Sequence, residues 1–216
     1  IDTIDRAVTV IGTQQLRDLA LATSVTEMFA GIPDALVNMD SFWRHSIATG
    51  VAARILVTHR RESNAERLFV AGLLHDVGRL IIFMQMPDEA AVMLEQAQEK
   101  QLLLVRVERD HLGFDHAAVG GALLRQWQLP EHLVGAVEFH HQPSRTKRFL
   151  DASIVHLADI IASSVQMGSS GSHTISPLDP AAWEQLELSE SVFAPTLSQL
   201  ERQYNDAVRF ILPDAG

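Results

Sequence analysis

The chain has no cysteine among its 216 residues. This absence excludes disulfide bonds and metal sites built from thiolates, so any metal ion would be held by histidine nitrogen and carboxylate oxygen. A protein without disulfides suits a reducing compartment. We therefore expect a cytoplasmic location.

Basic charge is also scarce, since 17 Lys and Arg against 27 Asp and Glu give a net charge of −10. This excess of negative charge repels a phosphate backbone and argues against general nucleic-acid binding. No apolar run reads as long enough to cross a bilayer and no signal segment opens the chain, so we expect no membrane insertion. A small phosphorylated ligand stays a candidate, because a divalent cation can reverse the local field.

Hydrophobic residues make up 47% of the chain and charged residues 20%. This composition excludes disorder and predicts a packed core. The length fits one domain, or a core with a small appended unit. The chain begins with Ile1 rather than Met, from which we expect a fragment of a longer protein.

Apolar residues recur with helical rather than alternating spacing through most of the sequence. The pattern predicts an all-α fold, a helical bundle without strands. Asp40 or Ser41 can cap the start of one helix, and Pro87 and Pro130 stand where helices begin. We expect helices at 4–11, 13–30, 41–59, 64–85, 87–100, 103–111, 114–127, 130–141, 149–167, 179–186 and 189–211.

The flexible-looking segment 168–172, Gly-Ser-Ser-Gly-Ser, is followed by Pro177 and Pro180. It divides a histidine-rich core, 1–167, from a linker and C-terminal helices, 168–216. We expect this tail to pack on the core, because an apolar stripe is costly to leave in water. The stripe consists of Leu197, Leu200, Tyr204, Val208 and Ile211.

Histidines and aspartates form an ordered set within or at the ends of the expected helices. Neutral imidazoles and carboxylates are ligands for divalent metals, so converging helices would create a metal pocket. A solitary helical histidine is more often a core or surface residue, and the prediction therefore depends on the whole set. The set is His45, His75, Asp76, His116, His140, His141 and Asp159.

The neighbours His75 and Asp76 would point about 100° apart on a helix, which disfavours a shared approach to one ion. Asp76 could instead bridge two ions. His111 competes with His116 for one ligand position, and His156 shares a helical face with Asp159. The spacing alone leaves both open, and we set them aside only on the family resemblance given next, which selects His116 and Asp159.

The central motif is Gly72-Leu73-Leu74-His75-Asp76-Val77-Gly78-Arg79. It resembles the signature of the HD superfamily of metal-dependent phosphohydrolases, and the other candidates follow in the order of that superfamily. Four further phrases are Trp43-Arg44-His45-Ser46, Glu108 with His116 and Gly120, Trp127-Gln128-Leu129-Pro130 and His140-His141-Gln142-Pro143. These phrases are similar to the HDOD group, a group of signalling output domains, and the resemblance extends from Ile4 to about Phe210.

The resemblance implies an all-α core with one or two divalent ions of iron, manganese, nickel or zinc. It implies one ion at the residues His45, His75, Asp76 and Asp159, and a second at His116, His140 and His141. It also implies a regulatory domain or signalling protein as partner. The Gly-Tyr-Pro motif of the related cyclic-di-GMP phosphodiesterases is missing, which makes that nucleotide a poor first choice of substrate.

Two functions remain open alongside a purely structural role for the histidines. The first is a signalling output domain, and the second is a phosphohydrolase acting on a small phosphorylated or nucleotide substrate. In the second, Asp76 and Arg79 are the candidate catalytic residues, with Asp76 between the ions and Arg79 orienting the phosphate. Arg79 stands where many relatives have lysine, and its guanidinium can hold a phosphate through two hydrogen bonds.

Overall fold

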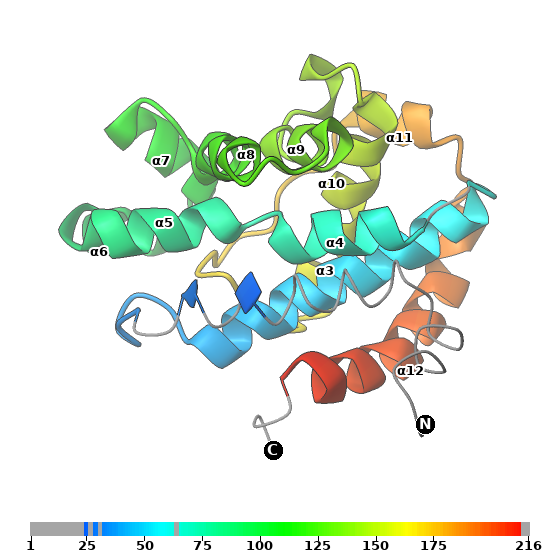
Figure 1. The fold of residues 1–216 in the computed structure, drawn as a ribbon, viewed down its shortest axis with the longest axis horizontal. Helices are drawn as coiled ribbons and strands as arrows, with labels where there is room; N and C mark the ends of the chain where they lie inside the picture. The colour runs from blue at the N-terminus through cyan, green and yellow to red at the C-terminus, as the bar shows by residue number, and fades with distance from the viewer. Residues whose placement is uncertain (1–23, 26–27, 30–31, 63–64, 213–216) are drawn as a thin grey trace.

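The computed structural model describes residues 24–25, 28–29, 32–62 and 65–212. Within these ranges the chain forms helices and no strand, which confirms the all-α prediction (Figure 1). The expected helix 4–11, and 13–30 apart from residues 24–25 and 28–29, lie outside the described residues. The α-helices are α3 Met39–His59, α4 Glu66–Leu74, α5 Val77–Gln85, α6 Pro87–Glu99, α7 Leu104–Leu112, α8 His116–Gln126, α9 Glu131–Glu138, α10 Phe149–Ser164, α11 Pro180–Leu186 and α12 Phe193–Ile211.

Helix α3 runs through the centre of the described fold and contacts α4, α10 and α12 (Figure 1). Its start differs from the prediction, because Asn38 rather than Asp40 or Ser41 is the capping residue. The Asn38 side chain accepts a hydrogen bond of 2.8 Å from the backbone N–H of Ser41, which satisfies an amide that the helix leaves unpaired. Nearly all of α3 from Phe42 to Val57 is buried, as expected of a central helix.

The expected helix 64–85 is divided in two, and this corrects the prediction. Asp76 has φ −99° and ψ 5°, outside the helical range, so α4 ends before it and α5 begins after it. The turn changes the direction of the chain at the central motif.

Glycines allow the helices on both sides of this turn to approach their neighbours closely. A Cβ atom on Gly72 would lie 2.7 Å from the Cα of Gly50 on α3. A Cβ atom on Gly78 would lie 2.0 Å from the backbone oxygen of His116 on α8. These two contacts bring the turn close to both α3 and α8.

The segment Glu66–Gln85 is long and apolar enough by length and composition to span a membrane, contrary to our reading of the sequence. However, 83% of its most apolar window is buried inside the protein. The turn at Asp76 also interrupts it. In this fold the segment is therefore a core element.

The C-terminal part packs against the body of the domain through α11 on α10 and α12 on α3. Of the expected stripe, Leu200, Val208 and Ile211 are buried and Tyr204 is partly buried. Leu197 is 40% exposed, so its assignment to the stripe was wrong. Thr196 lies four residues before Leu200 and therefore on the same face of the helix. Thr196 is buried in place of Leu197.

Residues 168–176, here called the covering loop, connect α10 towards α11 and appear in yellow to orange in Figure 1. The loop is attached to α3, because the Ser169 backbone N–H donates to the Ser41 carbonyl oxygen at 3.1 Å. Gly168 has φ +79°, and a Cβ there would lie 2.2 Å from that same oxygen. The loop therefore has a defined position across α3.

Candidate metal centre

The seven predicted ligands lie in two adjacent groups, although they come from five parts of the chain. Within each group the possible ligand atoms all lie within 4.8 Å of one another. One group consists of His45 on α3, His75 after α4 and Asp159 on α10. The other is Asp76, His116 at the start of α8, and the pair that follows α9, His140 and His141.

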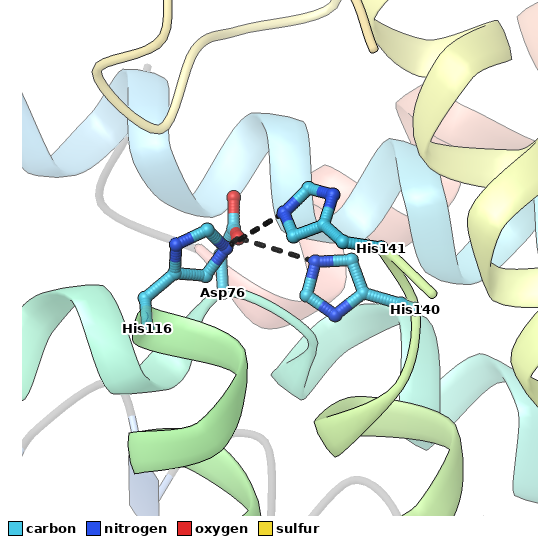
Figure 2. A group of neighbouring side chains, drawn as sticks. All are labelled: Asp76, His116, His140 and His141. Carbon is cyan, nitrogen blue, oxygen red and sulfur yellow. Dashed lines mark hydrogen bonds and ion pairs between the residues drawn. The ribbon is translucent and has the colours of Figure 1, made fainter. Parts of the chain in front are cut away.

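Asp76 connects the two groups through its two carboxylate oxygens. Its Oδ1 lies 2.9 Å from His116 Nε2 and 3.9 Å from His140 Nε2. Its Oδ2 lies 3.3 Å from His75 Nε2 and 3.9 Å from His45 Nε2. Figure 2 shows Asp76 facing the three rings of its own group. This position fits a carboxylate shared by two sites.

The expected helix 130–141 ends earlier, at Glu138, and His140 and His141 follow in the turn. Their rings lie with centroids 4.0 Å apart. His141 Nε2 is 3.0 Å from His116 Nε2, so both members of the pair face the centre of the group (Figure 2). A continued helix would have separated them by about 100°.

Hydrogen bonds to backbone carbonyls orient two of the rings. The Nδ1 atom of His75 is 2.7 Å from the Gly72 carbonyl oxygen, and that of His140 is 2.7 Å from the Val137 carbonyl oxygen. Because carbonyls only accept, each Nδ1 donates and each Nε2 keeps its lone pair. These two buried Nε2 atoms form no hydrogen bond with the described residues. Unsatisfied lone pairs beside carboxylates fit a divalent cation.

The pKa values of several groups in the cluster are strongly shifted. Burial and Arg79 lower the pKa of His116, but the nearby carboxylates of Glu108 and Asp76 outweigh them and raise it to about 9. Burial and the charges of neighbouring histidines lower the pKa of His140 to about 3. Burial opposes ionisation of Asp76, but the positive charges around it hold its pKa well below the usual range. The neutral imidazole and ionised carboxylate are the forms that bind metal.

Arg79 lies at the edge of the cluster and is buried. Its Nη1 donates to Asp76 Oδ2 at 3.2 Å and to the carbonyl oxygen of Ser170 at 3.1 Å. The guanidinium therefore joins the central motif to the covering loop. Its Nη2 lies 3.1 Å from His116 Nε2, so protein groups rather than a phosphate surround the guanidinium in this arrangement.

The covering loop leaves little room over the cluster. A cavity of about 30 Å³ is lined by Asp76, Arg79, His141 and Asp159 together with serines and a threonine of the loop. A neighbouring cavity of about 330 Å³, which shares Ser170, Ser172 and Thr174 of the loop with the first, reaches His45 but none of the other six predicted ligands. The first space suits water or ions, since small-molecule sites usually measure about 300 to 1,000 Å³.

Glu108 and Ser170 are two residues of this site outside the predicted ligand set. Glu108 entered the prediction only as part of the HDOD resemblance and without a role. Glu108 stands eight residues before His116, and Ser170 lies in a segment that reads as a linker. Of the histidines that we set aside, His111 is exposed. His156 is buried and bonds to the carbonyl oxygen of His140 at 2.8 Å. His156 thus supports the turn behind the cluster.

Comparisons with known proteins agree with this architecture. An HDOD domain protein of unknown function from Geobacter sulfurreducens superposes with a TM-score of 0.81 at 21% identity, over 98% of this chain and 76% of that one. The response regulator MmoQ from Methylococcus capsulatus str. Bath gives 0.56 at 25% identity, over 74% and 62%. These likenesses support the fold.

An uncharacterised protein of Treponema pallidum (strain Nichols) is 24% identical over 140 residues, which is 64% of this chain. The chain spans only 26% of that curated relative. The family model described as HDOD domain matches residues 1–143. That match includes six of the seven predicted ligands and leaves out Asp159. Because the match extends over more than half of the sequence, the chain belongs to the HDOD domain family.

Proposed function

We propose that this chain is a cytoplasmic signalling output domain whose fold is stabilised by one or two divalent ions at the His/Asp cluster. The observation that carries the proposal is the convergence of six buried or nearly buried candidate ligands around a seventh, Asp76. Iron, manganese, nickel and zinc suit such a set of nitrogen and oxygen ligands. A regulatory domain or another signalling protein would read the metal-stabilised shape.

The covering loop favours signalling over hydrolysis in the described conformation. The cavity beside Asp76 and His141 has a volume of about 30 Å³, which is too small for a phosphate ester. Ser170 also accepts the hydrogen bonds that Arg79 would give to a phosphate. The likeness to the response regulator MmoQ points to the same class of function.

A phosphohydrolase is the second candidate, and the bridging position of Asp76 favours it. When bound, two ions would supply positive charge and Lewis acidity for attack on phosphorus. His45, His75 and Asp159 would hold one ion, and His116, His140 and His141 the other, with Asp76 between them. Arg79 would orient the phosphate after release from Ser170, which requires displacement of the covering loop.

The variant Asp76→Ala tests the proposal. A divalent ion at about 100 times its Kd should stabilise the wild type by roughly 2.7 kcal/mol, which raises Tm by about 5 to 10 °C. Asp76→Ala should lose this increase because both groups lose a ligand. Melting curves with and without Mn²⁺ or Zn²⁺ measure it. Asp151→Ala is a matched control, since Asp151 is a buried aspartate of α10 paired with Arg67 rather than with the cluster.

Turnover of a generic phosphodiester, measured on the same proteins, separates the two functions. Signalling predicts no turnover by the wild type with any of the four metals. Turnover that Asp76→Ala abolishes would support the phosphohydrolase instead. Equal Tm increases in the wild type and in Asp76→Ala would contradict a metal site at Asp76.

A further inference from the structure

Glu108 contacts a predicted ligand without belonging to the ligand set. It lies on α7 and is 1% exposed. Its Oε2 atom is 2.5 Å from His116 Nδ1 and accepts the backbone N–H of the same residue at 2.9 Å. One carboxylate oxygen therefore binds both the ring and the backbone of His116, at the first residue of α8.

This contact determines which nitrogen of His116 faces the cluster. With Nδ1 against the carboxylate, Nε2 points to Asp76 Oδ1 at 2.9 Å and to His141 Nε2 at 3.0 Å. Arg79 Nη2 also lies beside the ring, 3.1 Å from Nε2. A carboxylate that accepts from one ring nitrogen leaves the other free to bind a metal and makes it a stronger ligand. The ring is thus oriented by a residue outside the cluster.

The other anchored rings of the cluster have a weaker kind of partner. His75 and His140 are held by backbone carbonyl oxygens, which carry no net charge. Charge-assisted hydrogen bonds are stronger than neutral ones. The second carboxylate oxygen of Glu108 lies 3.5 Å from Arg79 Nε, so the same residue also faces the guanidinium at the edge of the site.

We propose that Glu108 is a positioning residue for the metal group of Asp76, His116, His140 and His141. Its carboxylate keeps His116 in the form protonated on Nδ1, so that Nε2 binds the ion. The inference rests on the proposed function, since it requires that the group binds metal. It predicts an asymmetry, because the group of His45, His75 and Asp159 does not depend on Glu108.

Calorimetric titration of the metal-free protein with Zn²⁺ tests this asymmetry. In Glu108→Leu, the affinity of one site should fall by about 10- to 100-fold, while the other site changes less than about threefold. Glu108→Gln should recover most of the loss, because its amide oxygen can still accept from Nδ1. Asp151→Asn, which removes a charge from a buried aspartate outside the cluster, should match the wild type.

A second measurement needs no variant at Glu108. Correlation of ring ¹⁵N and ¹H signals in the Zn²⁺-loaded wild type should show His116 with its proton on Nδ1, and a proton on Nε2 would overturn the inference. Two unchanged Zn²⁺ sites in Glu108→Leu would also overturn it and leave the proposed function standing. A wild type that binds no Zn²⁺ would overturn the inference, and one that also binds no Fe²⁺, Mn²⁺ or Ni²⁺ would overturn the proposed function with it.

Discussion

The residues His75 and Asp76 are neighbours in the sequence, yet they face different partners in the structure. His75 lies with His45 and Asp159, whereas Asp76 also reaches the group of His116. The sequence identified the residue types and their order, and the bridging role of Asp76 stays a prediction. The sequence did not predict the contact of Glu108 with the His116 ring, because a glutamate eight residues before a histidine has no regular helical relation to it. Only the approach of α7 to the start of α8 brings them together.

Charge at His116 leads to a prediction for the metal-free protein. Folding raises the His116 pKa from its unfolded value, near 6.5, to about 9. A raised pKa stabilises the fold fully below pH 6.5, and this stabilisation is lost as pH rises through 9. The free energy of unfolding should therefore fall between pH 6.5 and 9, by up to about 3 kcal/mol. His75, whose pKa is also raised, contributes in the same direction.

Urea unfolding of chelator-treated protein at several pH values measures this fall. His116→Gln should reduce it, because the ring that gains the proton is missing. His140 does not contribute in this range, since its lowered pKa acts below pH 6.5. A free energy of unfolding that stays constant or rises from pH 6.5 to 9 would contradict the assigned contacts of His116.

At the scale of the helices, the sequence predicted most elements but not their ends near the site. The break between α4 and α5 was missed because Leu73, Leu74 and Val77 continue an apolar helical pattern through it. Helix α9 was expected to continue to residue 141 but ends at Glu138. Periodicity reports which residues can be buried, whereas the site depends on where each helix stops.

The variant Gly78→Ala tests the close contact of α5 with α8. The added Cβ would lie 2.0 Å from the His116 backbone oxygen and 2.4 Å from the Gly120 backbone nitrogen. Backbone atoms cannot move aside as a flexible side chain can, so we expect a loss of about 3 kcal/mol or more in the free energy of unfolding. Urea denaturation measures it.

Gly135→Ala in α9 is the matched control, because its nearest contact would be the Thr146 hydroxyl at 3.3 Å. Alanine also has the higher helix propensity, so this change should stay within about 1 kcal/mol of the wild type. Equal effects of the two substitutions would show that α5 and α8 do not cross at Gly78.

At the scale of the whole molecule, composition and periodicity predicted the all-α fold but not the path of the covering loop. Residues 168–172 have the composition of a flexible linker. Their position comes from particular contacts, including Arg79 with Ser170 and Ser169 with Ser41. These partners lie far apart in sequence, so local composition contains no sign of them. The division of the chain at residue 168 stays a prediction.

Packing of the C-terminal tail predicts different costs for two leucines of the same helix. Leu200 is fully buried and Leu197 is 40% exposed. Leu200→Ala should lower the free energy of unfolding by about 2 to 5 kcal/mol, since it leaves a cavity between α12 and the core. Leu197→Ala should cost less than about 1 kcal/mol. Equal costs in thermal or urea unfolding would show that α12 does not dock as described.

The metal content of the purified protein tests the central claim most directly. Elemental analysis of wild type prepared without chelator should find one or two divalent ions per chain, and Asp76→Ala prepared in parallel should contain fewer. We expect this result because the buried Nε2 atoms of His75 and His140 form no hydrogen bond with the described residues and are free to bind an ion. Wild type that contains no metal, and takes up none on incubation with Fe²⁺, Mn²⁺, Ni²⁺ or Zn²⁺, would contradict the account.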